Sequence, residues 1–420
     1  MHSTKIKYRL VVMSFLQFFV WGTWLITVSN YWFITKGWSG ADFGAIFSTL
    51  GFASVIMPAL TGIIADRWVN AERLYGILHI LGGLALACIP AVNHPGTFFW
   101  VIFAAMLCYM PTIALSNSVA YNILKTNHFD VIKVFPSIRV WGTVGFIAAM
   151  WVTNLTGNKA SPNQFYVAAA VAVVLGGYSF TLPKCPPLKS AERGASLIEL
   201  LGLSGFKLFC NPKIALFFVF SMFLGGALQL TNMYGDVFLS DFATIPKYSN
   251  SFVVKYSTII LSISQVSETL FILAIPFFLK RFGIKMVMLI SMLAWVLRFG
   301  FFAYGNPAGG LWMILLSCIV YGMAFDFFNI SGSLFIETTT DSKIRSSAQG
   351  LFMMMTNGFG AIFGSLVSGY VIDRYFTING TKNWHGIWLS FALYALVIAI
   401  AFAIIFRYKH DPEVVKNHSH

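Results

Sequence analysis

The chain has 420 residues, of which 57% are hydrophobic, 17% aromatic and only 10% charged, with a mean hydropathy of +0.74. This composition is too apolar for a soluble domain of that length and argues against an enzyme with large soluble domains. The net charge of +13 does not indicate nucleic-acid binding, because no Lys/Arg cluster lies on a soluble module that could present it. The excess of basic residues is better explained by orientation in a membrane.

Long continuous apolar runs predict an all-α membrane protein and exclude a β-barrel, whose strands are short and alternate. Breaks at Gly, Pro and charged residues predict twelve transmembrane helices. Their approximate bounds are 9–34, 41–66, 72–92, 97–124, 136–157, 162–183, 212–240, 253–279, 283–305, 309–337, 346–376 and 384–407. The first is expected to be a retained helix rather than a signal peptide, because no small-residue cleavage site follows it.

The longest polar segment separates the sixth and seventh predicted helices. It predicts an N-terminal six-helix half at 1–183, a linker at 184–211 and a C-terminal six-helix half at 212–420. Lys and Arg gather in the loops on the side of the first residue, so both termini and the linker are predicted to be cytoplasmic. The five cysteines have no metal-ligand spacing and are expected to be unpaired core residues, and no metal or cofactor is expected.

The eighth predicted helix carries Gln265 and Glu268 near its middle. Their i, i+3 spacing places both on one helix face, which must contact protein or water. An ionisable group at mid-depth is costly, so it marks by default a proton, ion or substrate site. The alternative is that Glu268 is one half of a buried pair that joins two helices.

Three other predicted helices carry polar or aromatic stripes. They are Arg139, Thr143 and Phe146 in the fifth helix, Gln229 and Asn232 in the seventh, and Tyr321, Phe325, Asp326 and Asn329 in the tenth. Amides, carboxylates, a guanidinium and rings together suit a planar heterocycle attached to a polyol. For the rings and the amides, helix packing is the competing interpretation.

Two further residues have structural interpretations. Arg298 in the ninth helix is expected to partner Asp326, and His79 in the third helix is expected to be a satisfied packing residue. Asp326 lies about 140° around its helix from Tyr321, at about 100° per residue. We therefore expect Asp326 behind the pocket, beside Asn329 and Arg298 in a second polar layer. In this scheme Asp326 is tied mainly to proton coupling or to the conformational switch, and Glu268 mainly binds substrate and also takes part in coupling.

The segment Gly62-Ile-Ile-Ala-Asp66-Arg67 resembles the Gly-x-x-x-Asp-Arg signature of the major facilitator superfamily. The residues after Arg67 depart from that signature. The six-plus-six organisation also resembles this superfamily, whose two pseudo-symmetric halves are built from inverted three-helix repeats. The resemblance implies the major facilitator fold.

Five longer motifs are similar to the nucleoside:proton symporter family of bacterial nucleoside permeases. They lie at 14–24, 139–146, 264–269, 325–332 and 347–350. The resemblance covers essentially the whole chain and implies a nucleoside site between the halves. The residues that match the family's binding positions are Arg139, Thr143, Phe146, Gln229, Asn232, Gln265, Glu268, Tyr321 and Phe325, and Asp326 matches its helix-ten carboxylate.

We therefore expect a monomeric transporter, without catalytic residues, that takes up nucleosides with protons across the bacterial cytoplasmic (inner) membrane by alternating access. Its partners are nucleosides, protons and membrane lipid, and not nucleic acid. Two alternatives stay open. One is a proton-coupled carrier of a sugar or another small polar solute, and the other is a nutrient receptor that binds without transport.

Overall fold

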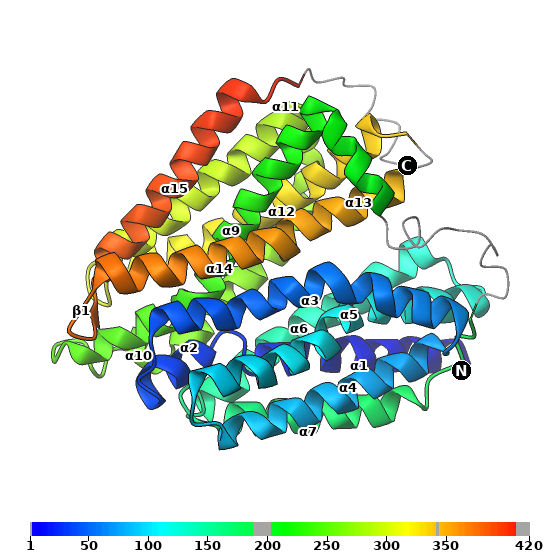
Figure 1. The fold of residues 1–420 in the computed structure, drawn as a ribbon, viewed down its shortest axis with the longest axis horizontal. Coiled ribbons are helices and arrows are strands. Elements are labelled where there is room, and N and C mark those ends of the chain that lie inside the picture. Colours follow the sequence, from blue (N-terminus) through cyan, green and yellow to red (C-terminus); the bar gives the residue numbers. More distant parts are fainter. Residues whose placement is uncertain (1, 188–202, 342–343, 409–420) are drawn as a thin grey trace. The chain divides into compact units, whose positions relative to one another are not determined.

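The computed structural model describes residues 2–187, 203–341 and 344–408, and these are almost entirely helical, as predicted (Figure 1). The chain divides into two compact units, residues 1–201 and 202–420, called here the N-terminal and C-terminal units. Residues 188–202 of the predicted linker 184–211 lie outside the described part of the chain.

The N-terminal unit contains the first six predicted spans. Its elements are α1 (His2–Gly22), α2 (Val28–Asn30), η1 (Tyr31–Thr35), α3 (Gly40–Arg67), α4 (Ala71–Cys88), η2 (Ile89–Ala91), α5 (Pro95–Thr126), α6 (Val131–Leu155) and α7 (Asn163–Ser179). Within it, α1 packs on α6, α3 packs on α5, and α4 lies between α5 and α7.

The C-terminal unit contains the other six. Its elements are η3 (Leu203–Cys210), α9 (Pro212–Asp241), η4 (Phe242–Thr244), α10 (Phe252–Lys255), α11 (Ser257–Tyr304), α12 (Leu311–Thr339), α13 (Arg345–Met353), η5 (Met354–Phe359), α14 (Gly360–Val371), η6 (Ile372–Phe376), β1 (Thr377–Ile378), β2 (Thr381–Lys382) and α15 (Trp384–Ile405). The two strands pair as a small antiparallel hairpin. Within this unit α11 packs on α12 and α15, and α9 packs on α14.

The first span is not the continuous helix that the sequence predicted at 9–34, because residues 23–27 form a turn between α1 and α2. Neighbouring helices supply hydrogen bonds in this interruption. Thr153 of α6 donates to the carbonyl of Thr23 at 3.0 Å, and Thr27 donates to Oε1 of Gln164 on α7 at 2.9 Å. Irregular backbone is tolerated in a membrane protein where it is buried in protein, and Thr23 and Thr27 are both buried.

The eighth and ninth spans form the single assigned helix α11. At 48 residues it would be about 72 Å long if straight, more than twice the hydrocarbon thickness of a bilayer. Gly283, at φ 75°, interrupts it and separates the two spans close to the predicted boundary. Glycine carries no Cβ and therefore adopts this left-handed conformation readily. The eighth span begins at Ser257 rather than 253, because α10 is a separate short helix.

Glycines allow close helix packing in both units. A Cβ at Gly145 of α6 would overlap the carbonyl oxygen of Phe15 on α1. A Cβ at Gly225 of α9 would overlap the carbonyl oxygen of Thr356 in η5. Small residues that let backbones approach in this way are typical of helix packing in membranes, where van der Waals contact drives association.

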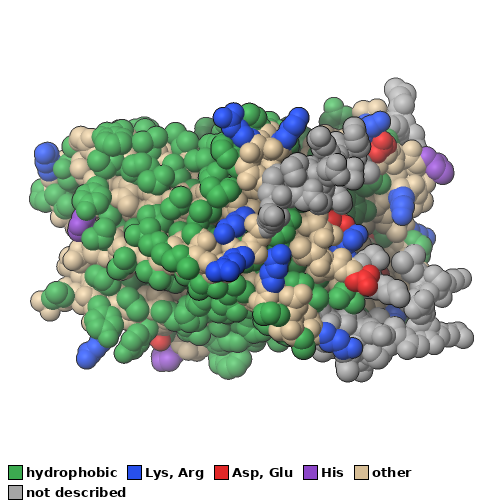
Figure 2. Space-filling view, turned by 90° about the horizontal axis from the view of Figure 1, so that it is seen from above, with side chains coloured by type: hydrophobic (Ala, Val, Ile, Leu, Met, Phe, Trp, Pro, Cys, Tyr) green, Lys and Arg blue, Asp and Glu red, His purple; other side chains and the backbone are tan. Residues whose placement is uncertain are grey.

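The exposed surface is largely apolar. Hydrophobic side chains gather over the left and central parts of the face shown in Figure 2, and Leu273 and Ile404 are 77% and 69% exposed. Nine helices of the described residues are long and apolar enough to cross a membrane, and the kinked α11 counts once among them. The other predicted spans correspond to α1 and α7. An apolar surface of this extent fits contact with lipid.

The segment just after the sixth span is tied to the start of α4. The backbone N–H of Cys185 donates to Glu72 at 2.8 Å, and Asn70 donates to the same carboxylate at 3.1 Å. Burial, together with the charge of Glu72, raises the pKa of the Cys185 thiol to about 12. All five cysteines are free, but Cys88 and Cys210 are exposed, so the prediction that all five are core residues is wrong for these two.

Candidate functional site

Arg139 of α6 is half-buried, and its guanidinium carbon lies 4.1 Å from the centre of the Phe18 ring on α1. Gly142 makes room for this contact. A Cβ there would come within 2.6 Å of the Phe18 ring and 2.7 Å of Nη1 of Arg139. The cation–π contact is worth about 0.5–2 kcal/mol and holds the guanidinium against one ring face. Thr143 and Phe146, on the same helical stripe, are also half-buried.

A buried hydrogen-bond network of the same unit is centred on Gln17 of α1. Its Oε1 accepts from the Tyr75 hydroxyl at 2.6 Å and lies 2.7 Å from Nε2 of His79. Its Nε2 donates to Thr112 at 2.9 Å, and the Tyr109 hydroxyl donates to its backbone carbonyl at 2.7 Å. His79 therefore has a hydrogen-bond partner, in agreement with its predicted packing role. The sequence alone gave no signal for Gln17 as the centre of this network.

In the C-terminal unit, α12 presents two of the predicted rings as a parallel stack. The centroids of Tyr321 and Phe325 are 6.1 Å apart with an interplanar angle of 5°. The ring of Trp295 on α11 meets Tyr321 edge-on at 5.9 Å. The Gln265 side chain lies near the Tyr321 hydroxyl. Tyr321 is buried and Phe325 half-buried, so Phe325 is the more accessible ring of the pair.

Both predicted carboxylates belong to this neighbourhood. Asp326 is only 6% exposed, whereas Glu268 on α11 is half-buried. The two lie within electrostatic range of each other and of Tyr321. Oδ2 of Asp326 has no hydrogen-bond partner in the described part of the chain. The structure thus brings Gln265, Glu268, Tyr321 and Asp326 together.

The prediction that Arg298 partners Asp326 is wrong. Arg298 is completely buried, and it donates instead to Thr231 on α9 at 3.2 Å, to Ser264 at 3.3 Å and to the carbonyl of Ser317 on α12 at 2.8 Å. Its guanidinium carbon also lies 4.5 Å from the centre of the Tyr321 ring. Arg298 therefore joins three helices around the ring stack. It was noticed in the sequence as an intramembrane charge, but its partners are uncharged groups that carry no such signal.

The expected second polar layer of Asp326, Asn329 and Arg298 is not formed either. The Asn329 amide donates to the carbonyl of Phe325 on its own helix at 3.1 Å. Its side chain lines a small cavity and is not bonded to Asp326. Asp326 is absent from the lining of that cavity. The position behind the pocket that the helical angle gave to Asp326 is compatible with this arrangement.

The two amides of α9, Gln229 and Asn232, differ in burial. Gln229 is buried, and its Oε1 has no hydrogen-bond partner among the described residues, whereas Asn232 is half-buried. An unpaired buried amide oxygen is costly, so this atom is available to a ligand or a water molecule. Thr231, which lies between these two residues in sequence, is the residue of α9 that reaches the stack through Arg298.

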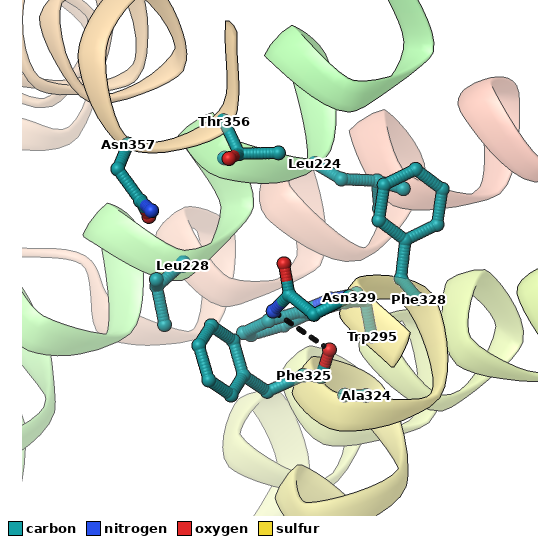
Figure 3. A pocket seen from close by; sticks show the side chains of 10 residues that line it. Leu224, Leu228, Trp295, Ala324, Phe325, Phe328, Asn329, Thr356 and Asn357 are labelled. Carbon is teal, nitrogen blue, oxygen red and sulfur yellow. Dashed lines mark hydrogen bonds between the residues drawn. The ribbon is translucent and has the colours of Figure 1, made fainter. Parts of the chain in front are cut away.

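Figure 3 shows the small cavity, which is lined by residues of α9, α11, α12 and η5. Its volume is about 20 Å³. Phe325 lines it together with Trp295, Asn329, Thr356 and Asn357. Thr356 and Asn357 were missed by sequence reasoning, because a single amide in an apolar run is common in helix packing.

The C-terminal unit thus combines a stacked aromatic pair with amides, two carboxylates and a buried guanidinium inside membrane-spanning helices. Rings bind planar groups by stacking, amides donate and accept hydrogen bonds, and carboxylates take up and release protons. No group of His, Cys, Asp and Glu in the described residues is arranged to hold a metal ion. These properties fit the binding of a small polar solute together with a proton.

The fold and the buried polar groups define a multi-pass helical transporter of the major facilitator class. A solved structure of a point mutant of the nucleoside transporter NupG matches with a TM-score of 0.93 and 49% identity, over 96% of this chain and 100% of that chain. The chain belongs to the nucleoside H⁺ symporter family, which it matches over residues 4–411.

Two curated relatives support this assignment. The chain is 52% identical to the xanthosine permease of Escherichia coli (strain K12) over 98% of each chain. It is 50% identical to the nucleoside permease NupG of the same organism, over 96% of this chain and 97% of the relative. The protein is therefore a nucleoside/proton symporter and not an enzyme, as the sequence motifs predicted. This family assignment favours nucleoside transport over the two alternatives, a sugar carrier and a receptor.

Proposed function

We propose that the protein takes up nucleosides together with protons by alternating access across a bacterial cytoplasmic membrane, as a monomer with both termini in the cytoplasm. The observation that carries this proposal is the stack of Tyr321 on Phe325 beside two carboxylates, in a chain of the nucleoside H⁺ symporter family. The excess of Lys and Arg on the side of the first residue supports the orientation.

The ring stack supplies the nucleobase contact in this proposal. A nucleobase placed on the accessible face of Phe325 would extend the existing stack by one ring. Tyr321 in turn is held by Arg298 and Trp295, so the platform is formed before substrate arrives. A rigid platform loses little conformational entropy on binding.

The polar side chains supply hydrogen bonds and charge. In the C-terminal unit we assign Gln229, Asn232, Gln265 and Glu268 to nucleoside binding. In the N-terminal unit we assign Arg139, Thr143 and Phe146 to nucleoside binding. Asp326, with Glu268, is assigned to proton coupling, because a buried carboxylate without an ion-pair partner is free to change protonation state as its surroundings change.

An uptake panel in proteoliposomes tests the proposal. Labelled nucleosides, free bases and ribose are offered with an outside-acid pH gradient and without it. We expect accumulation of nucleosides only with the gradient, and ribose should be a poor competitor of uridine. Equal competition by ribose, or accumulation that ignores the gradient, would refute it.

The role of α9 is tested separately with Gln229→Ala and Asn232→Ala. Each variant loses hydrogen bonds worth about 1 kcal/mol, so the nucleoside KM should rise about fivefold while the protein stays in the membrane. Ser221→Ala is the matched control, because its buried hydroxyl on the same helix donates only to the carbonyl of Phe217 at 2.8 Å. Unchanged KM in both amide variants would remove α9 from the site.

A further inference from the structure

The small cavity of the C-terminal unit has properties that helix packing does not require. Its volume of about 20 Å³ is close to what one water molecule needs. Two amides from different elements line it, Asn329 of α12 and Asn357 of η5, beside the accessible ring of Phe325 (Figure 3). The cavity is therefore polar on one side and aromatic on another.

Both amides retain hydrogen-bonding capacity. Asn329 uses one N–H for the Phe325 carbonyl, and Figure 3 shows its side-chain oxygen directed away from that bond. The Asn357 amide donates to Sδ of Met353 at 3.8 Å, and a thioether is a weak acceptor. Neither side chain is fully buried, so both can be reached from outside the cavity. Each can therefore still exchange a hydrogen bond with a ligand atom.

The position of Asn357 is fixed by its backbone. It lies in the π-helical turn Met354–Phe359, and such turns are frequent at functional sites. Gly225 permits close contact of α9 with Thr356, the residue before Asn357, and a Cβ at Gly360 would lie 2.5 Å from the carbonyl oxygen of Met222. The π turn is thus pressed against α9, which holds the amide at the cavity wall.

We propose that this cavity is a subsite for one polar substituent of the nucleobase, which Asn329 and Asn357 recognise by hydrogen bonds while the base lies on Phe325. The inference rests on the proposed function and deepens it. The volume admits one oxygen or nitrogen substituent and no ring. The subsite therefore distinguishes nucleosides that differ in a single exocyclic group.

The test compares uridine with cytidine and inosine with adenosine. The members of each pair differ in one exocyclic group and in the protonation of the ring nitrogen beside it. For each variant, the ratio of kcat/KM within a pair is measured by uptake into proteoliposomes. This ratio does not depend on the amount of folded protein. We expect Asn357→Leu and Asn329→Leu to change at least one ratio by between about twofold and about tenfold, the effect of losing one hydrogen bond.

A second variant and a control keep the test decisive. Asn357→Asp has the same shape but a different set of donors and acceptors, and it is used if the leucine variants do not reach the membrane. Met353→Leu removes the sulfur contact of Asn357 and should leave both ratios unchanged. If the Asn357 and Asn329 variants transport all four nucleosides with the parent's ratios, the cavity holds only a structural water and the inference is refuted. Failure of the parent to accumulate any nucleoside would instead refute the proposed function.

Discussion

Asp326→Asn is the most informative single change, because it removes a titratable group and keeps its shape. Asp326 is 6% exposed, and Oδ2 has no hydrogen-bond partner in the described residues. Burying a charge without a partner costs several kcal/mol, so the neutral amide should not destabilise the protein. We expect normal amounts of folded protein and retained nucleoside binding.

The loss should appear in accumulation. One pH unit across the membrane is worth about 1.4 kcal/mol per proton, which supports up to about tenfold accumulation for each coupled proton. The parent should therefore approach about tenfold under a one-unit outside-acid gradient if one proton is coupled. Asp326→Asn should equilibrate nucleoside to a ratio of about one, because no protonation change is left at this position to link the gradient to transport.

The assay combines direct binding to purified protein with uptake into proteoliposomes of set internal and external pH. Glu268→Gln is the companion variant, since Glu268 is half-buried beside Gln265 and Tyr321 and should lose nucleoside binding first. The division of roles fails if Asp326→Asn still accumulates nucleoside uphill, or if Glu268→Gln binds as tightly as the parent.

Three further predictions use other parts of the chain. Phe325→Leu removes one ring of the stack, worth about 0.5–1.5 kcal/mol, so nucleoside affinity should fall between about twofold and about tenfold in a direct binding measurement; unchanged affinity would exclude stacking. Gly142→Ala places a Cβ 2.7 Å from Nη1 of Arg139, so the nucleoside KM should rise severalfold at normal expression, whereas Gly177→Ala, which meets no atom within 4 Å, should not change it. The proposed orientation predicts that a membrane-impermeant maleimide added to intact cells labels His94→Cys, in the loop before α5, but not Cys210, although both positions are exposed, and the reverse pattern would invert the orientation.

Hydropathy was sufficient to predict the helical fold, because the bilayer leaves few choices for an apolar run of about twenty residues. Hydrogen bonding within the helix is the main way to satisfy the backbone there. The predicted continuous helix at 9–34 was wrong because other helices supply hydrogen bonds at residues 23–27. Thr153 and Gln164 bond to this interruption. Donors and acceptors from other helices cannot be seen in the local pattern.

The candidate site was partly predictable because the bilayer also restricts which side chains a membrane-spanning helix can carry. Polar groups are costly in a bilayer, so Glu268, Asp326 and Arg298 were conspicuous in the sequence. Their partners were not. Arg298 bonds to two hydroxyls and a carbonyl rather than to a carboxylate, because helix packing decides which uncharged groups come within about 3 Å.

The sequence by itself determined the family, the number of spans and the residue types available for binding a nucleoside and a proton. Only the tertiary structure decided which of them meet. The parallel stack of Tyr321 on Phe325 and the cavity that Asn357 shares with Asn329 depend on distances between helices. Those distances are set by glycines such as Gly225 and by the π turn that packs against it, and therefore by backbone contacts that hydropathy does not record.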